Sequence, residues 1–397
     1  MPLRSLREFI KLESSAGIIL FCAAVFALIL DNTPLHTYYH AFFHLPLTLK
    51  LGAVGLEKPL LLWINDGFMA IFFLLVGLEI KREFLEGELR TPSKALLPGI
   101  AAVGGMVVPA LIYIAFNYAD PQAIHGWAIP MATDIAFSLG ILALFGKRIP
   151  LALKVFLTAL AIFDDLGAII VIAIFYTNEI SLIMLLIAVI LLLILFVMNR
   201  YHVTHFAPYF LVGLVLWVCV LKSGVHATLT GILVALAIPM RDSKNRRLSP
   251  LKDLEHKLHP WVAFGVLPIF AFANAGVSFA GLRPMHLVSE IPLGIMLGLF
   301  VGKQLGVWGA TMLSVRLGIA KLPRKVTGFG IYAVSLLAGV GFTMSLFIGG
   351  LAFDGSTPEF GAYVRFGVLV GSIVSGIVGY LILRSLYSKS AVVSQDP

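Results

Sequence analysis

Two adjacent aspartates, Asp164 and Asp165, lie near the middle of the apolar stretch 157–176, which reads LTALAIFDDLGAIIVIAIFY. A helix needs about 20 mostly apolar residues to cross the hydrocarbon core of a bilayer, and this stretch provides them. A charged side chain near the bilayer centre costs about 2.5–3.5 kcal/mol on insertion scales, so intramembrane acids usually mark ion or proton pathways. The pair therefore indicates a site for cations or protons inside the membrane.

The chemistry of this pair follows from charge and burial. Hard cations prefer oxygen ligands, which carboxylates supply. Two close carboxylates repel each other when both are ionised, so the pair is expected to titrate as one coupled unit. We expect such a site to hold protons at lower pH and a monovalent cation at higher pH. Alternating exposure to the two sides would then exchange cations for protons without ATP, and the chain contains no P-loop motif.

Two further stretches place polar groups at the same predicted depth. WAIPMATDIAFSLG has Thr133 and Asp134 shortly after Pro130, and GLFVGKQLG contains Lys303. Proline removes a helical hydrogen bond, so the backbone near 131–133 is expected to be unwound or kinked. Lys303 is the one basic residue expected at this depth and is a natural partner for one of the aspartates.

The stretch LLAGVGFTMSLFIGG predicts a second interrupted helix, because Gly339 and Gly341 weaken the helix at its centre. Broken helices direct partial charges at the point of interruption, and Asp134 and Lys303 can offset them. Taken singly, Pro130 reads as an ordinary kink and the glycines as close packing. Their occurrence at one depth together with buried charge favours a site.

The composition identifies the class of protein. Hydrophobic residues make up 59% of the chain and charged residues 13%, with a mean hydropathy of +0.97, whereas soluble domains are about half apolar and a quarter charged. We therefore predict an all-α polytopic membrane protein with one transporter domain over residues 1–397. Cys22 and Cys219 lie in separate apolar stretches and predict neither a disulfide nor a zinc site.

About twelve apolar stretches of membrane-spanning length follow one another along the chain. Spans three to five and ten to twelve start from opposite sides of the membrane, and the interrupted spans four and eleven are their middle members. Such inverted-topology repeats point to a transporter site near the midplane. A small hairpin outside the membrane is predicted at about 45–58. The spans are expected near residues 15–30, 60–80, 95–116, 124–145, 150–175, 182–199, 206–221, 223–240, 259–275, 289–312, 329–350 and 360–383.

The basic residues predict the orientation. With both termini in the cytoplasm, 22 of the 29 Lys and Arg residues fall in cytoplasmic segments, which is the excess described by the positive-inside rule. The net charge of +8 therefore reflects orientation and does not indicate a nucleic-acid partner. The residues expected outside are Lys50, Lys58, Lys222, Arg283 and Arg365, and Lys154 and Lys303 lie within spans.

Two classes of membrane enzyme also use acidic pairs, and the sequence favours neither. Intramembrane aspartyl proteases carry YD and GxGD motifs on separate helices, and neither motif occurs here. A prenyltransferase would require DDxxD-type spacing for Mg²⁺ and diphosphate, whereas Asp165 is followed by LGAI. The chain is thus not expected to be an enzyme. A sodium-coupled symporter of an organic anion remains an alternative, which a co-substrate requirement would reveal.

The chain resembles the NhaA family of bacterial sodium/proton antiporters over about residues 12–385. The resemblance implies exchange of Na⁺ or Li⁺ for H⁺ without a cofactor, in the bacterial inner membrane, with two protons per sodium ion and a homodimeric assembly. The matching motifs are LLWINDGFMAIFFLLVGLEIKRE at 61–83, GWAIPMATDIAFSLG at 126–140, ALAIFDDLGAII at 159–170, VLKSGVHATLTG at 220–231, EHKLHPWVAF at 255–264 and GVGFTMSLFI at 339–348.

The resemblance also implies roles for individual residues. Asp165 matches the principal cation and proton carboxylate, and Asp164 matches its neighbour, which pairs with the lysine matched by Lys303. Thr133 and Asp134 match the unwound segment, where the aspartate balances the ends of helix dipoles.

Finally, the resemblance implies activation at alkaline pH. It implicates His226 and a cytoplasmic cluster of titratable side chains, and it marks Gly341 as a position where small size matters. Judged from the residues alone, the histidines of this cluster read as the start of an interfacial helix. Asp66, near the outer side of the second span, is expected to line a funnel. The cluster consists of Glu79, Glu83, Glu255, His256 and His259.

Overall fold

The computed structural model describes residues 3–51, 54–177, 180–242, 248–279, 288–323, 326–354 and 357–387. The chain divides into two compact units, each made of discontinuous segments. The first unit comprises Met1–Asn32, Thr91–Ala168 and Asn274–Pro397, and the second comprises Thr33–Arg90 and Ile169–Ala273. Some basic residues used to predict the orientation lie outside the described residues, namely Lys244, Arg246, Arg247, Arg283, Arg324, Lys325 and Lys389.

The described residues form apolar helices and one small sheet. Seven of the described helices are long and apolar enough to cross a membrane, or up to nine if two bent helix pairs each count as one span. An all-α membrane protein is therefore confirmed. The count of twelve spans and the inverted repeat stay predictions.

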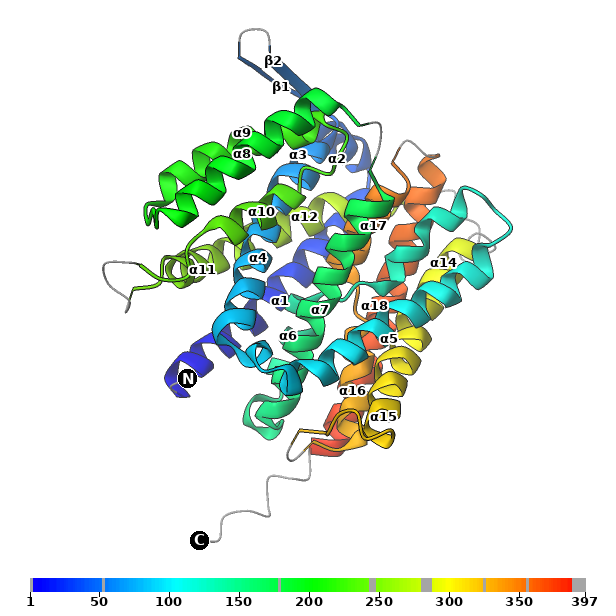
Figure 1. The fold of residues 1–397 in the computed structure, drawn as a ribbon. Coiled ribbons are helices and arrows are strands. Elements are labelled where there is room, and N and C mark those ends of the chain that lie inside the picture. The colour runs from blue at the N-terminus through cyan, green and yellow to red at the C-terminus, as the bar shows by residue number, and fades with distance from the viewer. Residues whose placement is uncertain are drawn as a thin grey trace. The chain divides into compact units, whose positions relative to one another are not determined.

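The first unit packs its helices around a core of fully buried aliphatic side chains that includes Leu157, Leu160, Ile331 and Val334. Within it, α18 contacts α14, α16 and α17, and α5 contacts α14 and α15 (Figure 1). Its helices are α1 (Leu3–Asp31), α5 (Pro92–Asn117), α6 (Ile135–Ala143), α7 (Leu151–Phe175, which belongs to this unit up to Ala168), α14 (Glu290–Leu297), α15 (Gly309–Arg316), α16 (Gly328–Ala338), α17 (Phe342–Ala352) and α18 (Pro358–Tyr387). It also contains the 3₁₀-helices Ala123–Met131 and Gly146–Arg148 and the π-helices Gly298–Gly302 and Gln304–Trp308.

The second unit contains the sheet and the remaining helices. Strands β1 (Pro46–Leu51) and β2 (Val54–Pro59) pair antiparallel, with Leu49 opposite Leu56, at the place where the sequence predicts a hairpin. Its position outside the membrane stays a prediction. The helices are α2 (His36–Phe43), α3 (Leu60–Trp63), α4 (Met69–Glu86), α8 (Leu182–Arg200), α9 (Phe206–Lys222), α10 (Leu229–Ala237), α11 (Pro250–Trp261) and α12 (Leu267–Asn274), with π-helices at Ile64–Phe68 and Val262–Val266 and a 3₁₀-helix at Glu88–Arg90.

Glycines let α4 and α10 pack backbone against backbone. A Cβ on Gly231 would overlap the Ala70 carbonyl oxygen, and a Cβ on Gly77 would lie 2.7 Å from the Cβ of Ala235. These two contacts show that α4 and α10 run in the same direction. The carboxyl-terminal ends of both helices therefore lie together.

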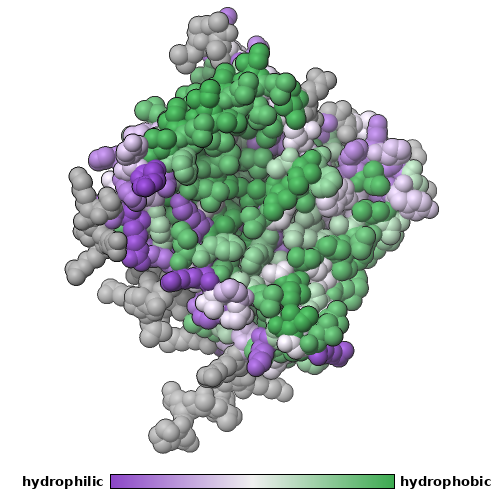
Figure 2. Space-filling model, viewed as in Figure 1, coloured by the Kyte–Doolittle hydropathy of each residue, from purple (hydrophilic) through white to green (hydrophobic). Residues whose placement is uncertain are grey.

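Helices α8 and α9 present apolar side chains on the outside of the second unit, as Figure 2 shows. Leu182, Leu186, Leu193 and Leu211 are all more than half exposed. Such a surface would be unfavourable in water but is the normal covering of a helix against lipid.

Both interruptions predicted from the sequence are present in the first unit. The 3₁₀-helix Ala123–Met131, which contains Pro130, is followed by non-helical backbone at 132–134 and then by α6. Helices α16 and α17 are bent by 46° at the break between them, where Gly339 and Gly341 lie. Non-helical backbone at membrane depth requires hydrogen-bond partners from the surrounding protein, and here each break supplies partners for the other.

Candidate functional site

The two breaks meet through a backbone hydrogen bond, because the Asp134 amide donates to the Val340 carbonyl oxygen at 2.7 Å. The non-helical residues 132–134 thus lie against the non-helical residues between α16 and α17. Two serine side chains strengthen this contact. Ser138 donates to the Leu337 carbonyl oxygen at 2.7 Å, and Ser345 donates to the Ile129 carbonyl oxygen at 2.7 Å.

Asp134 caps the amino-terminal ends of two helices at once. Its Oδ1 accepts from the Phe137 amide of α6 at 2.9 Å, and its Oδ2 accepts from the Thr343 amide of α17 at 3.1 Å and from the Thr343 hydroxyl at 2.5 Å. The residue is 1% exposed. A carboxylate is stabilised at helix amino-terminal ends, where unpaired N–H groups and the macrodipole favour negative charge.

We expect Asp134→Ala to lower the free energy of unfolding by about 2–4 kcal/mol, since each lost cap costs about 1 kcal/mol and buried amides are left without acceptors. Asp134→Asn retains an acceptor oxygen and should lose about half as much. Thermal unfolding of the detergent-purified variants measures both. Equal losses for Ala and Asn would contradict the double-cap assignment.

Lys303, Asp164 and Thr133 form a buried ionic cluster beside these breaks. The Lys303 ammonium lies 2.6 Å from Asp164 Oδ2 and 3.0 Å from Thr133 Oγ1. The Thr133 hydroxyl lies within donating distance of Asp164 Oδ2, at 2.6 Å, and of the Ala338 carbonyl oxygen, at 2.8 Å. All three side chains are 1% exposed or less. The cluster therefore connects α7, the Lys303 segment, residues 132–134 and the end of α16.

Lys303 reaches this position from a stretch of unusual helix, since π-helices flank it at Gly298–Gly302 and Gln304–Trp308. Such bulges are frequent at functional sites. Gln304 stabilises the stretch, because its Nε2 donates to the Phe300 carbonyl oxygen at 2.7 Å and its Oε1 accepts from the Tyr332 hydroxyl of α16 at 2.7 Å.

Asp165 follows Asp164 on α7 and is equally buried, at 1% exposed. Adjacent residues on a helix project about 100° apart, so the two carboxylates face different surroundings. Asp164 is held by Lys303 and Thr133 through Oδ2. Its Oδ1 is buried and accepts no hydrogen bond from the described part of the protein.

Gly339 and Gly341 allow close approach at the second break. A Cβ on Gly339 would overlap the Leu299 carbonyl oxygen and lie 2.7 Å from Ser375 Oγ, and a Cβ on Gly341 would overlap the Ser345 hydroxyl. The absence of a side chain at both positions is therefore required by the packing.

Of the predicted mid-membrane residues, the structure brings Thr133, Asp164 and Lys303 into direct contact. Asp134 follows Thr133 in the chain and is bonded to Thr343 and to the Val340 backbone. Serines on neighbouring helices, among them Ser138 and Ser372, were not among the predicted residues. Hydroxyl side chains inside apolar stretches were the available signal for these residues. A buried hydroxyl without a hydrogen-bond partner costs free energy, so each was expected to bond to a nearby group.

The second unit contains the predicted titratable cluster. Arg82 lies at its centre, with its Nη1 2.5 Å from Glu83 Oε1 and its Nε 2.9 Å from Glu255 Oε1. Glu79 lies within electrostatic range of Arg82, Glu83 and Glu255. Arg82 was not among the predicted residues, although a basic residue beside several acids in the sequence was an available signal.

Burial raises the pKa of Glu255 above its usual range, and the Arg82 guanidinium and the nearby His256 oppose this shift. A carboxyl with a raised pKa takes up its proton at a higher pH than an exposed one does. As pH falls through that pKa, Glu255 becomes neutral and its ion pair with Arg82 is lost. As pH rises, the pair forms.

His226 does not join this cluster. Its Nε2 is in hydrogen-bonding contact with the Tyr176 carbonyl oxygen, and it precedes α10, whose opposite end receives the Lys81 ammonium at the Leu236 and Ile238 carbonyl oxygens. Since α4 and α10 run in the same direction, His226 lies near the beginning of α4, whereas Glu79 lies near its end.

Asp66 also lies at that beginning, within the π-helix Ile64–Phe68. Its Oδ2 pairs with the Lys58 ammonium of β2 at 3.1 Å, and its backbone oxygen accepts from Trp217 Nε1 at 3.2 Å. These contacts connect the sheet to the first turn of the span. A role in lining a funnel stays a prediction.

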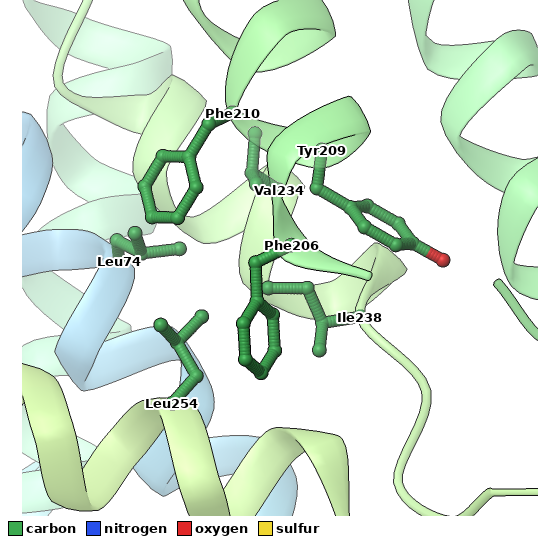
Figure 3. A pocket seen from close by; sticks show the side chains of 7 residues that line it. All are labelled: Leu74, Phe206, Tyr209, Phe210, Val234, Ile238 and Leu254. Carbon is green, nitrogen blue, oxygen red and sulfur yellow. The ribbon is translucent and has the colours of Figure 1, made fainter. Parts of the chain in front are cut away.

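An apolar crevice in the second unit lies between α4, α9, α10 and α11 (Figure 3). The Tyr209 hydroxyl points away from it and donates to the Val203 carbonyl oxygen at 3.2 Å. The described side chains that line the crevice therefore offer no polar group with which to orient a ligand. Its lining residues are Leu74, Phe206, Tyr209, Phe210, Val234, Ile238 and Leu254.

The protein has apolar helices suited to a lipid bilayer and a buried ionic site beside two broken helices. This combination is the architecture of a secondary transporter. The comparisons with known proteins agree. The family model described as Na⁺/H⁺ antiporter 1 matches residues 7–383. The chain therefore belongs to this family and is a multi-pass membrane protein, and the resemblance to NhaA antiporters is confirmed.

Several curated relatives are described as Na⁺/H⁺ antiporter NhaA. The relative from Rhodospirillum rubrum is 57% identical over 390 residues, covering 97% of this chain and 98% of its own. The relative from Aeromonas salmonicida is 58% identical over 386 residues, covering 97% of each chain. The relative from Proteus mirabilis is 52% identical over 384 residues, again covering 97% of each.

Proposed function

We propose that this protein exchanges Na⁺ or Li⁺ for protons by alternating access, with Asp164 and Asp165 as the groups that hold the cation or the protons. The observation that carries the proposal is the buried Asp164–Lys303 pair, with Asp165 as its neighbour, where two broken helices meet. A helix that served only to span the membrane would rarely contain these charged side chains, because burying each one in the bilayer costs free energy.

Cation binding is attributed to oxygen atoms around the aspartates. Asp164 Oδ1 is a buried acceptor with no hydrogen-bond donor in the described part of the protein. The Thr133 hydroxyl lies 2.6 Å from the other Asp164 oxygen, and the Ala338 carbonyl oxygen lies 2.8 Å from that hydroxyl. Na⁺ and Li⁺ are hard ions that prefer such ligands. The cation is the transported substrate and replaces protons as it binds.

The proposed ratio of two protons per cation requires two titrating groups. The two buried carboxyls, Asp164 and Asp165, are these groups, because two close carboxylates titrate as one coupled unit. Exchange of two protons for one Na⁺ moves net charge, so transport should be electrogenic.

We propose that the protein lies in the bacterial inner membrane with both termini in the cytoplasm, which the excess of basic residues in the expected cytoplasmic segments supports. We also propose a homodimer, as the resemblance to the family implies.

We further propose that the cluster of Glu79, Arg82, Glu83 and Glu255, with His256 and His259 on α11, sets activation at alkaline pH. Glu255 forms its ion pair with Arg82 only when it is ionised. Rising pH therefore joins α11 to α4 through this pair, and falling pH releases it.

Glu255→Gln should leave Arg82 without this ion pair at every pH, as the wild type is at acidic pH. We expect the pH of half-maximal exchange to move to a more alkaline value, because Gln cannot ionise. The measurement is the exchange rate across about pH 6.5–8.5. Asp253→Asn is the matched control, since Asp253 lies on the same helix but pairs at the surface with Lys257, at 2.9 Å. An unchanged pH profile in Glu255→Gln would argue against this role.

The proposed exchange is tested with purified protein in liposomes that hold an inside-acid pH gradient, read by a pH-sensitive dye. Addition of NaCl or LiCl should collapse the gradient and KCl should not, with a rate that rises with pH. Absence of collapse with Na⁺ and Li⁺ at every pH, in protein shown to be folded, would reject the exchange. A collapse that required an added organic anion would instead indicate a symporter.

A further inference from the structure

The amino-terminal end of α17 is buried and has no cap of its own. The first N–H groups of a helix lack partners within the helix, and Gly341, at the N-cap position, has no side chain to supply one. Asp134 accepts from the Thr343 amide. The Gly341 and Phe342 amides still require an acceptor.

Ser372 on α18 provides that acceptor. Its Oγ accepts from the Gly341 amide at 3.2 Å and from the Phe342 amide at 3.1 Å. The side chain is buried, with the residue 5% exposed. A hydroxyl oxygen has two lone pairs, so these two bonds use its full accepting capacity. Three consecutive amides, those of Gly341, Phe342 and Thr343 at the start of α17, are thus satisfied by Ser372 and Asp134 together.

Ser375, three residues further along α18, offers a natural comparison. It is also buried, and its Oγ faces Gly339 on the other side of the same break. Its hydroxyl has no hydrogen-bond partner in the described part of the protein. Two serines of one helix thus face one break, and only Ser372 bonds to the backbone there.

We propose that Ser372 is a positioning residue for cation exchange, a role that rests on the proposed function. By fixing the Gly341 and Phe342 amides, it places Thr343 where its amide and hydroxyl bond to Asp134. Asp134 in turn is bonded to the Val340 backbone and directly follows Thr133, which contacts Asp164 and Lys303. Ser372 itself touches neither the aspartates nor the lysine. It acts by holding α17 in the position that completes the site.

The proposal is tested with Ser372→Ala, Ser372→Cys and the matched variant Ser375→Ala. Hydrogen–deuterium exchange of the segment containing Gly341 and Phe342 reports the cap directly and does not depend on transport. Initial rates of Na⁺-driven gradient collapse in liposomes, measured over a range of Na⁺ concentrations, report the site through the apparent KM.

In Ser372→Ala, we expect roughly tenfold faster amide exchange in this segment, since two buried donors lose their acceptor. We expect the apparent KM for Na⁺ to rise about five- to tenfold on the same grounds. Ser372→Cys should fall between Ala and wild type, because sulfur is a weak acceptor. Ser375→Ala should resemble wild type in both measurements.

Ser372→Ala that matched Ser375→Ala in both measurements would overturn the proposal. Faster amide exchange with an unchanged KM would also overturn it, because the serine would then be only structural. A wild-type protein without Na⁺-driven exchange would refute the proposed function, and the positioning role with it, while the amide exchange would still show whether Ser372 caps α17.

Discussion

In Asp165→Asn, Na⁺-driven collapse of the pH gradient is expected to fall about 100-fold or more, to the background of empty liposomes. The amide neither carries a transported proton nor contributes negative charge to the cation. A carboxylate–cation attraction is worth about 4 kcal/mol at an effective dielectric constant of about 20, which is large enough to account for this loss. The initial rate at saturating Na⁺ and alkaline pH is the quantity to measure.

The matched control is Asp354→Asn, which removes one carboxylate from an exposed position of the first unit. It should exchange at the wild-type rate. If Asp165→Asn also retained most of its activity, the central carboxylate would have been wrongly assigned.

The second large effect concerns stability. Lys303→Met should lower the free energy of unfolding by about 3–5 kcal/mol, because it leaves the buried Asp164 carboxylate without its ammonium partner at 2.6 Å. The expected consequence is a clear drop in Tm for the detergent-purified protein at neutral pH. The loss should shrink as pH falls, since protonation of Asp164 removes its unpaired charge.

The double variant Asp164→Asn with Lys303→Met separates lost charge pairing from lost packing. Replacement of both members of a buried ion pair by neutral groups is often nearly neutral, whereas removal of one is costly. The double variant should therefore be more stable than Lys303→Met alone. A double variant less stable than Lys303→Met would show that the two side chains stabilise the protein mainly by packing and not by charge pairing.

The sequence alone was sufficient to predict the class of protein, both helix interruptions and four residues that the structure brings together. This was possible because polar groups in apolar stretches are costly and hence conspicuous. Pro130 and Asp134 marked one break, and Gly339 and Gly341 marked the other. Their common depth indicated a shared site before any contact was known.

The partners within the site could not be predicted from local patterns. Asp164 and Lys303 are 139 residues apart in the chain. The residues alone indicated Lys303 as a partner for one of the two aspartates, and only the resemblance to a family specified Asp164. The role of Ser372 depends on the side of α18 that meets α17, which hydropathy does not specify. Likewise, the π-helices around Lys303 follow from packing and have no strong local signal.

Helix lengths in the second unit were also less predictable. The stretch 223–240 reads as one span, yet its helix, α10, extends only over Leu229–Ala237. Ser223, whose hydroxyl donates to the Val220 carbonyl oxygen, and Gly224, with its φ of 85°, turn the chain before α10 begins. Uniform hydropathy hides such turns, because their polar groups are satisfied locally.

In the proposed exchange, the same buried carboxylates hold either protons or a cation. Calorimetric titration of the purified protein with NaCl, in buffers that differ in ionisation enthalpy, counts the protons released when Na⁺ binds. We predict release of about one to two protons per bound Na⁺ at alkaline pH, and neither binding nor release in Asp165→Asn. Binding of Na⁺ to the wild-type protein without release of protons would contradict competition between Na⁺ and protons for these carboxylates.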